Sequence, residues 1–298
     1  QSLTGGLTVT EGTTLSIPVA YRAVQLISDS IGSLSFGAHR DDERLDPTPA
    51  VLRQPDPNQT RMETIGATVT SLVMRGNAYF ILGNRDRFGF PQSAILLSPD
   101  AVGVVIDRQG NISYQVNGTT YDTSEILHIR GGVVTPGSIS GAGPLQLQRR
   151  SLALSLAGDE AASESHVSGS IPSGVINSPQ EMSQEEATIL KQSFMKAHGG
   201  RQKSPAVLTG GLTYQALSWS PDDLQLLESR RYSSEQICTI FGVPPAMIGV
   251  STEGNSKTYS NVQQDNRFFV DYTLRGYMSR IEQSFSGLTV CNGMKHTG

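Results

Sequence analysis

The stretch FGVPPAMIG, residues 241–249, decides how this chain divides into elements. Proline lacks an amide proton and its ring clashes with the preceding helical turn, so two consecutive prolines stop a helix. We expect Pro244 and Pro245, helped by the turn that Gly242 allows, to terminate a helix near Phe241. A small, polar, glycine-bearing stretch follows at 250–258, VSTEGNSKT, and is typical of a pliable loop.

Long helical patterns lie on both sides of this stop. A helix should begin at Ser220-Pro221-Asp222-Asp223, which supplies a cap, a proline at the first position and acids at the positive helix end. After the loop, apolar residues at helical spacing predict a second long helix over 259–285, with Tyr272 among the residues of its apolar face. A third long helix, rich in alanine, serine and leucine, is predicted over 144–168.

A small mixed insert separates two of these long helices. Ser183 and Glu186 form an S-x-x-E capping box, which predicts a helix that ends at Gly199-Gly200. Strand patterns flank this helix, over 171–177 and as a hairpin over 205–218. The pattern therefore predicts a small α/β module between two long helices.

The N-terminal part combines helices with strands. Amphipathic helices are predicted over 17–34 and 61–75, with Leu34 and Met62 at the ends of their apolar faces and a polar loop over 41–58 between them. Five β-branched and aromatic runs separated by turn signals predict an antiparallel meander, at 77–83, 94–97, 101–106, 112–116 and 126–130. The stretch 131–144 is rich in glycine, serine and proline, which predicts a linker, with GAGP at 141–144 as a flexible helix entry. Helices and strands do not alternate, which favours an α+β fold over a doubly wound one.

The composition narrows the class of protein. The 298 residues include 23 basic and 27 acidic side chains, a net charge of −4, so no basic excess points to nucleic-acid binding over the whole surface. The two cysteines, Cys238 and Cys291, have no CxxC spacing, which disfavours a disulfide framework and structural zinc and favours a reducing compartment. We expect no membrane span, because no apolar run approaches roughly 20 residues, and no signal peptide.

Catalytic motifs are absent from the sequence pattern. GVSTEGNSKT at 249–258 resembles a phosphate-binding P-loop, but that motif needs the lysine directly after its second glycine, and Asn255 and Ser256 precede Lys257 here. SFMK at 193–196 matches S-x-x-K without the partner motifs of serine acylases. The five histidines show no metal-binding spacing. We therefore expect no enzyme, no cofactor and no metal site.

The C-terminal half resembles a known family. The runs LLESRRYSSEQICTIFGVPPAMIG (226–249) and TYSNVQQDNRFFVDYTLRGYMSRIEQSF (258–285) are similar to the portal proteins of tailed bacteriophages, of the HK97 type. Matching stretches occur in the same order upstream, at 75–89, 141–156, 172–176 and 206–228. The resemblance covers nearly the whole chain, from about Ile17 to Phe285.

The resemblance implies the portal fold and a ring, usually of twelve copies, around a channel for double-stranded DNA. It divides the chain into a wing (1–143), a first stem helix (144–170), a clip (171–220), a second stem helix (221–249), a tunnel loop (250–258), and a long wing helix with the truncated start of a crown (259–298). The stretch 286–298 has no helical stripe, so a crown should be reduced or absent from this segment.

The resemblance also implies partners and a location. The ring would sit at one capsid vertex of the virion, after assembly in the host cytoplasm, with no membrane. It would contact the terminase large subunit, then a head–tail adaptor, and the major capsid protein or scaffold. Alternatives from other classes are a head–tail adaptor or other structural ring protein, and a P-loop-like nucleotide hydrolase centred on 249–258.

Candidate site residues follow from these expectations. Four loop residues are candidates for the DNA channel, with Lys257 as a local ring of cations: Glu253, Asn255, Ser256 and Lys257. Arg201 and Lys203 are candidates for the clip opening or for docking the motor or adaptor. Gly242, Pro244 and Pro245 form the helix terminator.

Overall fold

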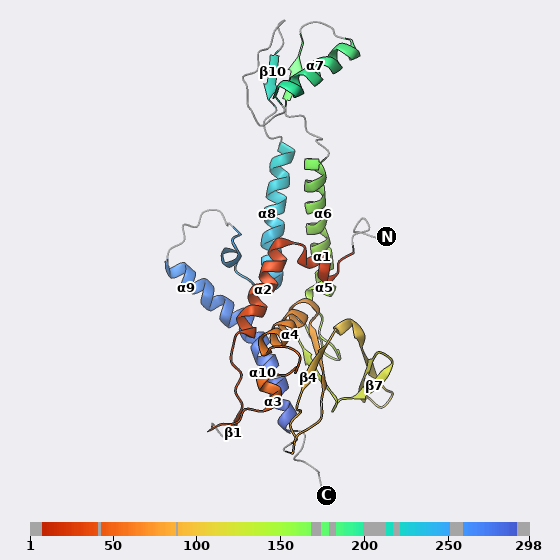
Figure 1. Cartoon of the computed structure of the whole chain (residues 1–298), viewed down its shortest axis with the longest axis vertical. Helices are drawn as coiled ribbons and strands as arrows, with labels where there is room; N and C mark the ends of the chain where they lie inside the picture. Colours follow the sequence, from red (N-terminus) through yellow and green to blue (C-terminus); the bar gives the residue numbers. More distant parts are fainter. Residues whose placement is uncertain are drawn as a thin grey trace. The chain divides into compact units, whose positions relative to one another are not determined.

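The chain forms two compact units. The computed structural model describes residues 8–40, 43–87, 89–167, 174–178, 183–198, 213–216, 221–250 and 259–290. Unit 1 comprises residues 1–157 and 230–298, and unit 2 comprises residues 158–229. Each of two helices, α6 (Arg149–Val167) and α8 (Pro221–Phe241), contains one of the two unit boundaries (Figure 1). Helices combine with antiparallel sheets, which confirms the α+β class.

Two amphipathic helices pack against each other in unit 1. They are α2 (Pro18–Gly32) and α4 (Arg61–Arg75), so the two predicted N-terminal helices are confirmed. α4 begins with a capping box in which the Thr60 amide donates to Glu63 at 2.7 Å. The predicted apolar faces are wrong at their ends. Leu34 is 44 % exposed because α2 ends at Gly32, and Met62, in the first turn of α4, is 47 % exposed.

Several short elements of the structure are not predicted by the sequence pattern. They are α1 (Glu11–Leu15), the two-residue strands β1 (His39–Arg40) and β2 (Glu43–Arg44), α3 (Ala50–Arg53), and the 3₁₀ turns η1 (Pro99–Ala101) and η2 (Pro245–Ile248). The predicted helix over 144–168 is divided into α5 (Pro144–Leu147) and α6. Gln148 leaves the helical region at φ −107° and ψ 19°, which separates the two helices.

The strands of unit 1 form two three-stranded antiparallel sheets, not one meander. The first sheet has the order β4-β3-β8, and the second has the order β5-β6-β7. Their bounds are Asn77–Leu82 (β3), Ala94–Leu97 (β4), Val102–Ile106 (β5), Ile112–Val116 (β6), Thr119–Asp122 (β7) and Ile126–Arg130 (β8). The predicted single meander is wrong because β3 pairs with β8, the last strand, with Tyr79 opposite His128.

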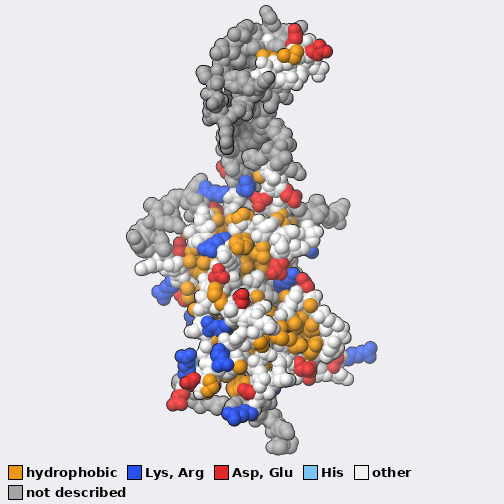
Figure 2. Space-filling view, in the orientation of Figure 1, with side chains coloured by type: hydrophobic (Ala, Val, Ile, Leu, Met, Phe, Trp, Pro, Cys, Tyr) orange, Lys and Arg blue, Asp and Glu red, His pale blue; other side chains and the backbone are white. Residues whose placement is uncertain are grey.

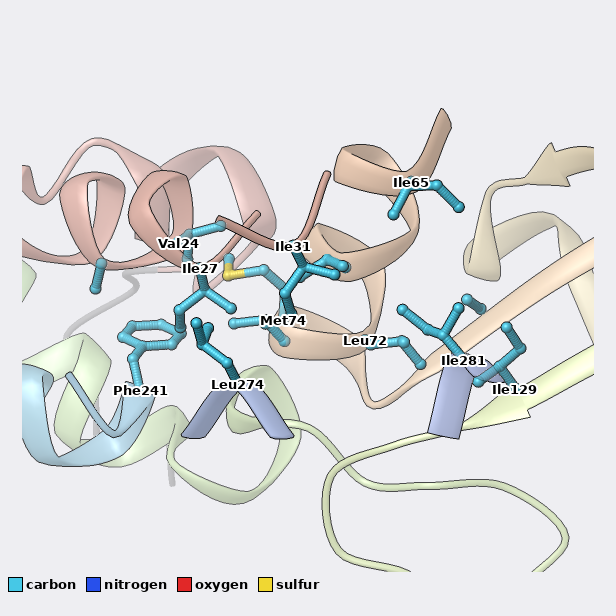
Figure 3. Packing of buried hydrophobic residues seen from close by; sticks show 14 of the residues in the cluster. Val24, Ile27, Ile31, Ile65, Leu72, Met74, Ile129, Phe241, Leu274 and Ile281 are labelled. Atoms are coloured by element: carbon cyan, nitrogen blue, oxygen red, sulfur yellow. The ribbon is translucent and has the colours of Figure 1, made fainter. Parts of the chain in front are cut away.

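The main core of unit 1 lies where helices meet the first sheet. Figure 3 shows side chains from α2, α4, β8, α8 and the C-terminal helices converging on one cluster. Ile27, Leu72, Met74 and Ile129 are fully buried there. Burying a side chain of this size contributes about 1.5–3 kcal/mol, so this cluster is the main source of stability in unit 1.

The glycine-rich stretch after β8 is packed, which corrects the prediction of a flexible linker. Val133 and Ala142 pair through two backbone hydrogen bonds of 3.0 and 2.9 Å. A Cβ atom on Gly141 would collide with the carbonyl oxygens of Gly131 and Gly76. Glycine is therefore required at position 141 because the segment presses directly on the backbone that joins α4 to β3.

A buried side-chain network fixes this segment to the first sheet. The Asn77 amide group donates to the Gly141 carbonyl at 2.7 Å and accepts from the Gly141 amide at 2.8 Å. The same Asn77 oxygen lies 3.0 Å from Nε2 of His128, so Nε2 carries the proton. Nδ1 of His128 is then the acceptor for the Tyr114 hydroxyl at 3.3 Å. The network requires a neutral His128.

Unit 2 contains a 15-residue helix, a two-stranded sheet and parts of α6 and α8. α7 (Gln184–His198) begins with the predicted capping box, in which Glu186 accepts from the Ser183 amide at 2.9 Å. β9 (Gly174–Asn177) and β10 (Thr213–Ala216) pair in antiparallel fashion. The hairpin predicted over 205–218 lies largely outside the described residues.

The low pKa of the buried His128 predicts that the protein loses stability in acid. Burial, with a smaller effect of Arg130, lowers the pKa of His128 from 6.5 to about 4. Below about pH 6.5, His128 is protonated in the unfolded chain but stays neutral in the native state. The free energy of unfolding therefore falls between pH 6.5 and 4. A shift of this size corresponds to about 3 kcal/mol. Denaturant titrations from pH 7 to 4.5 should show a shallower fall for His128→Gln than for wild type.

His39→Gln is the matched control, because His39 is exposed and its substitution should leave the pH dependence unchanged. An equally steep fall in His128→Gln and wild type would show that another group causes the acid sensitivity.

Candidate functional site

The candidate site is the joint at the C-terminal end of α8. The Gly242 amide donates to the Thr239 carbonyl at 3.2 Å, and the Val243 amide donates to the Cys238 carbonyl at 2.9 Å. These two bonds are those of a Schellman motif, which satisfies carbonyls that a helix end otherwise leaves free. Gly242 has φ 68°, the left-handed conformation that this motif requires at its glycine.

The end of α8 is tied to a distant helical segment through Gly242. The Thr273 hydroxyl donates to the Gly242 carbonyl, although the two residues are separated by 31 positions in the sequence. A Cβ atom on residue 242 would lie 2.9 Å from that hydroxyl oxygen. Glycine is therefore needed at this position both for its backbone conformation and for the close approach of Thr273.

The two prolines shape the chain after Gly242. Pro244 is extended, at φ −57° and ψ 126°, and Pro245 opens η2. The Met247 amide donates to the Pro244 carbonyl at 2.9 Å, and the Val250 amide donates to the Pro245 carbonyl at 3.0 Å. These bonds make a compact turn directly after the helix end.

Thr273 belongs to a π-helical segment, and this corrects the prediction of one regular helix over 259–285. The helical run consists of α9 (Tyr259–Phe268), the π segment η3 (Phe269–Leu274) and α10 (Arg275–Val290). The Arg275 amide donates to the Val270 carbonyl, five residues back. α10 also continues through residues 286–290, where the sequence shows no helical stripe. Isolated π turns are rare and are frequently found at functional sites.

The π turn changes which side chains face the core. Phe269 and Leu274 are buried at 3 % and 6 % exposure, whereas Tyr272 is 76 % exposed. The prediction that Tyr272 faces the core is therefore wrong, because the extra residue in the turn rotates its side chain outward. The same turn brings Thr273 to Gly242.

Apolar side chains anchor the joint in the main core. In Figure 3, Phe241 and Leu274 point toward Ile27 of α2. Val243 is 2 % exposed and belongs to the same cluster. The helix end, the π segment and α2 therefore form one packed body, in which the prolines and Gly242 set the direction of the chain.

The chemistry of the joint does not suggest catalysis. Cys238, a free thiol beneath the helix end, is buried, and burial raises its pKa to about 11, so it stays protonated at neutral pH. Within the described ranges no group of three or more His, Cys, Asp or Glu side chains is placed to hold a metal ion. The helices in that part of the chain also include none long and apolar enough to span a bilayer.

The structure places only part of the predicted site. Gly242, Pro244 and Pro245 lie together at the joint. The other predicted site residues lie outside the described residues: Glu253, Asn255, Ser256, Lys257, Arg201 and Lys203.

Sequence reasoning missed Thr273, the partner of Gly242. A polar threonine among the apolar residues of a long helix was the available signal, because a buried hydroxyl needs a hydrogen-bond acceptor. Its acceptor could not be identified from spacing, since Gly242 belongs to another helix end.

Replacing the glycine at the joint should destabilise unit 1. Gly242→Ala forces a side chain into the left-handed region and against Thr273, which should lower the free energy of unfolding by about 1–3 kcal/mol. Gly287→Ala is the matched control, because Gly287 lies in α10 with nothing within 4 Å of an added Cβ atom. Denaturant unfolding should show a change within about 0.5 kcal/mol, or a gain, for this control. Equal stabilities for the two variants would contradict the role of Gly242.

Known portal proteins are similar to this chain over most of its length. A probable portal protein of Streptomyces phage phiC31 is 28 % identical and aligns with 95 % of this chain and 66 % of its own length. The portal protein of Enterobacteria phage HK97 is 25 % identical and aligns with 94 % of this chain and 68 % of its own length. The chain thus spans about two thirds of the length of these relatives.

Solved structures show a similar fold. The neck of an empty gene transfer agent particle, computed with C6 symmetry, has a TM-score of 0.74 at 24 % identity and covers 96 % of this chain and 82 % of that chain. The neck of a native particle, computed with C12 symmetry, has a TM-score of 0.69 at 24 % identity and covers 93 % and 78 %. The model of the phage portal protein family matches residues 18–295. The chain therefore belongs to the phage portal protein family.

Proposed function

We propose that this chain is one subunit of a portal ring that conducts double-stranded DNA into and out of a virion. The observation that carries the proposal is the family match over residues 18–295. The likeness to neck structures with C6 and C12 symmetry supports a ring made of many copies. The function is mechanical and structural, with no catalytic step.

The order of elements supports an assignment of parts. Residues 1–143 form the wing, α6 and α8 are the stem helices, and residues 171–220 form the clip. Residues 250–258 form the tunnel loop, and α9, η3 and α10 form the long wing helix. The support for this assignment is that a small mixed module, with β9, α7 and β10, lies in the chain between two long helices.

The joint has a specific task in this proposal. It ends the second stem helix at Phe241. The hydrogen bond between Thr273 and Gly242 and the shared apolar core connect the two helices that flank the tunnel loop. A fixed joint would let the loop respond to DNA while the stem and wing stay in place. A channel through which DNA slides should bind phosphate weakly, because each DNA phosphate that a basic side chain neutralises raises the affinity for DNA.

The proposal includes partners and a location. The ring lies at the portal vertex of the capsid after assembly in the host cytoplasm. Its clip, including Arg201 and Lys203, meets the terminase large subunit during packaging and a head–tail adaptor afterwards. Its wing contacts the major capsid protein or scaffold.

The assembled mass tests the ring most simply. The purified chain, 32.0 kDa per copy, should form closed rings with an open centre in electron micrographs, with a native mass that is a multiple of the subunit mass. A protein that remains monomeric at all concentrations and binds nucleotide would contradict the portal function.

Lys257 provides a test of the channel. Lys257→Glu should reduce the retention of double-stranded DNA by purified rings at low salt, because each ring loses one cation per subunit, and the difference should vanish at high salt. Arg53→Glu is the control, since Arg53 is an exposed residue of α3. If Lys257→Glu rings retain DNA as wild type does at every salt concentration, Lys257 does not face the channel.

A further inference from the structure

The tip of the hairpin between β6 and β7 is an Asn-Gly step, on the side of unit 1 where Figure 1 labels β7 and Figure 2 shows the surface. Asn117 and Gly118 have φ 49° and φ 84°, both in the left-handed region, and Val116 pairs with Thr119 across the turn. These are the features of a two-residue type I′ turn, which favours asparagine followed by glycine. Both turn residues are exposed, so a side-chain amide and the next backbone nitrogen meet water at adjacent positions.

This arrangement supports a cyclisation that needs no partner except water. The backbone nitrogen of Gly118 attacks Cγ of Asn117 and forms a new N–Cγ bond. The Cγ–Nδ2 bond breaks, and ammonia leaves with the proton that the Gly118 nitrogen loses. The product is a five-membered succinimide ring. Water then opens the ring at the side-chain carbonyl to give aspartate, or at the main-chain carbonyl to give isoaspartate.

Both reacting groups are accessible in the structure. Gly118 has no side chain to shield its nitrogen, and a Cβ atom added there would have nothing within 4 Å. The Asn117 side chain makes no hydrogen bond to any described residue, so Cγ is free to turn toward that nitrogen. The tip also ends the ladder between β6 and β7, and such ends open locally at a low free energy. Opening lets the backbone leave the left-handed conformation for the attack.

Asn111 lies on the same strand pair and lacks these features. Its Nδ2 donates to Asp107 at 2.7 Å, which holds the amide group in place. The β-branched Ile112 follows it and crowds the nitrogen that would attack. Asn111 is exposed as well, so exposure alone does not distinguish the two asparagines. Among the described residues, every asparagine except Asn117 is followed by a residue with a side chain.

We propose that Asn117 is a site of spontaneous deamidation and that its isoaspartate product releases β7 from the second sheet. Isoaspartate continues the chain through its side-chain carbonyl, which adds a methylene group to the backbone of the turn. The longer turn no longer places Val116 opposite Thr119, and it moves Tyr121 from its position opposite Tyr114. β7 is an edge strand of the described sheet and is held there by its pairing with β6.

The aspartate product leaves the hairpin in place. Asp-Gly is also favoured in a type I′ turn, so the backbone of β6 and β7 keeps its register when Asn117 becomes aspartate. The two products therefore carry the same new charge and differ in the backbone alone. The reaction needs the folded chain and water, and does not depend on the portal function.

Peptide mapping of the aged protein tests the site. Asn111 and Asn117 lie between Arg108 and Arg130 on one tryptic peptide, so their conversion is compared in a single mass spectrum. After incubation of the full chain in mildly alkaline buffer, Asn117 should have converted about tenfold faster than Asn111, a barrier difference of about 1.4 kcal/mol. An unaged sample gives the background.

The second Asn-Gly step of the chain, Asn292-Gly293, lies outside the described residues and on another tryptic peptide, so it is scored separately. Conversion of Asn117 at or below the rate of Asn111 would overturn the proposed site.

Hydrogen exchange tests the release of β7. In the isoaspartate fraction of aged wild type, the amides of residues 119–122 should exchange faster than in unaged protein, while those of β5 should not change. Freshly purified Asn117→Asp is the matched control, because it has the same charge with a normal backbone and should exchange as unaged wild type does. Unchanged exchange of residues 119–122 in the isoaspartate fraction would overturn the release of the strand.

Asn117→Gln separates this reaction from other effects of ageing. Glutamine would have to close a larger ring, so aged Asn117→Gln should show no conversion at position 117 and no faster exchange in β7. Faster exchange of β7 in this aged variant would show that a different change loosens the strand and would contradict the proposal.

Discussion

The hydrogen bond from Thr273 to the Gly242 carbonyl is the contact on which the arrangement of the C-terminal helices depends. It joins Gly242, the left-handed glycine that follows α8, to a π turn in another helix, and a π turn is rare in helices. The local sequence accounts for the glycine at the helix end but not for the π turn. Because Gly242 has no side chain, Thr273 can come close to it, and the π turn places Thr273 there. The core around Phe241 and Leu274 holds both segments in place.

A second contact of the same kind fixes the other half of unit 1. Asn77 holds the backbone of Gly141 through two hydrogen bonds, as Thr273 holds the backbone of Gly242. In both places a polar side chain binds a glycine that lies far along the sequence. Such contacts attach a helix end and a glycine-rich segment to the core of unit 1. For a ring subunit they would give a rigid body from which a loop can be presented.

Local signals made much of the fold predictable. The capping boxes at Thr60 and Ser183 mark helix starts, and the prolines after Gly242 mark a helix end, because these effects act within a few residues. The pairing of β3 with β8 and the π turn were not predictable, since both depend on contacts between distant segments. The same limit applies to the candidate site. Gly242 was recognisable from its position before two prolines, but Thr273 was not.

A double-mutant cycle on Gly242 and Thr273 tests the central claim most directly. Thr273→Ala removes the hydroxyl oxygen that would lie 2.9 Å from a Cβ atom at position 242, so it should relieve part of the damage that Gly242→Ala causes. The double variant should lose about 1 kcal/mol less stability than the sum of the two single losses. Losses that add within about 0.5 kcal/mol would show that the two residues act independently and would contradict the account.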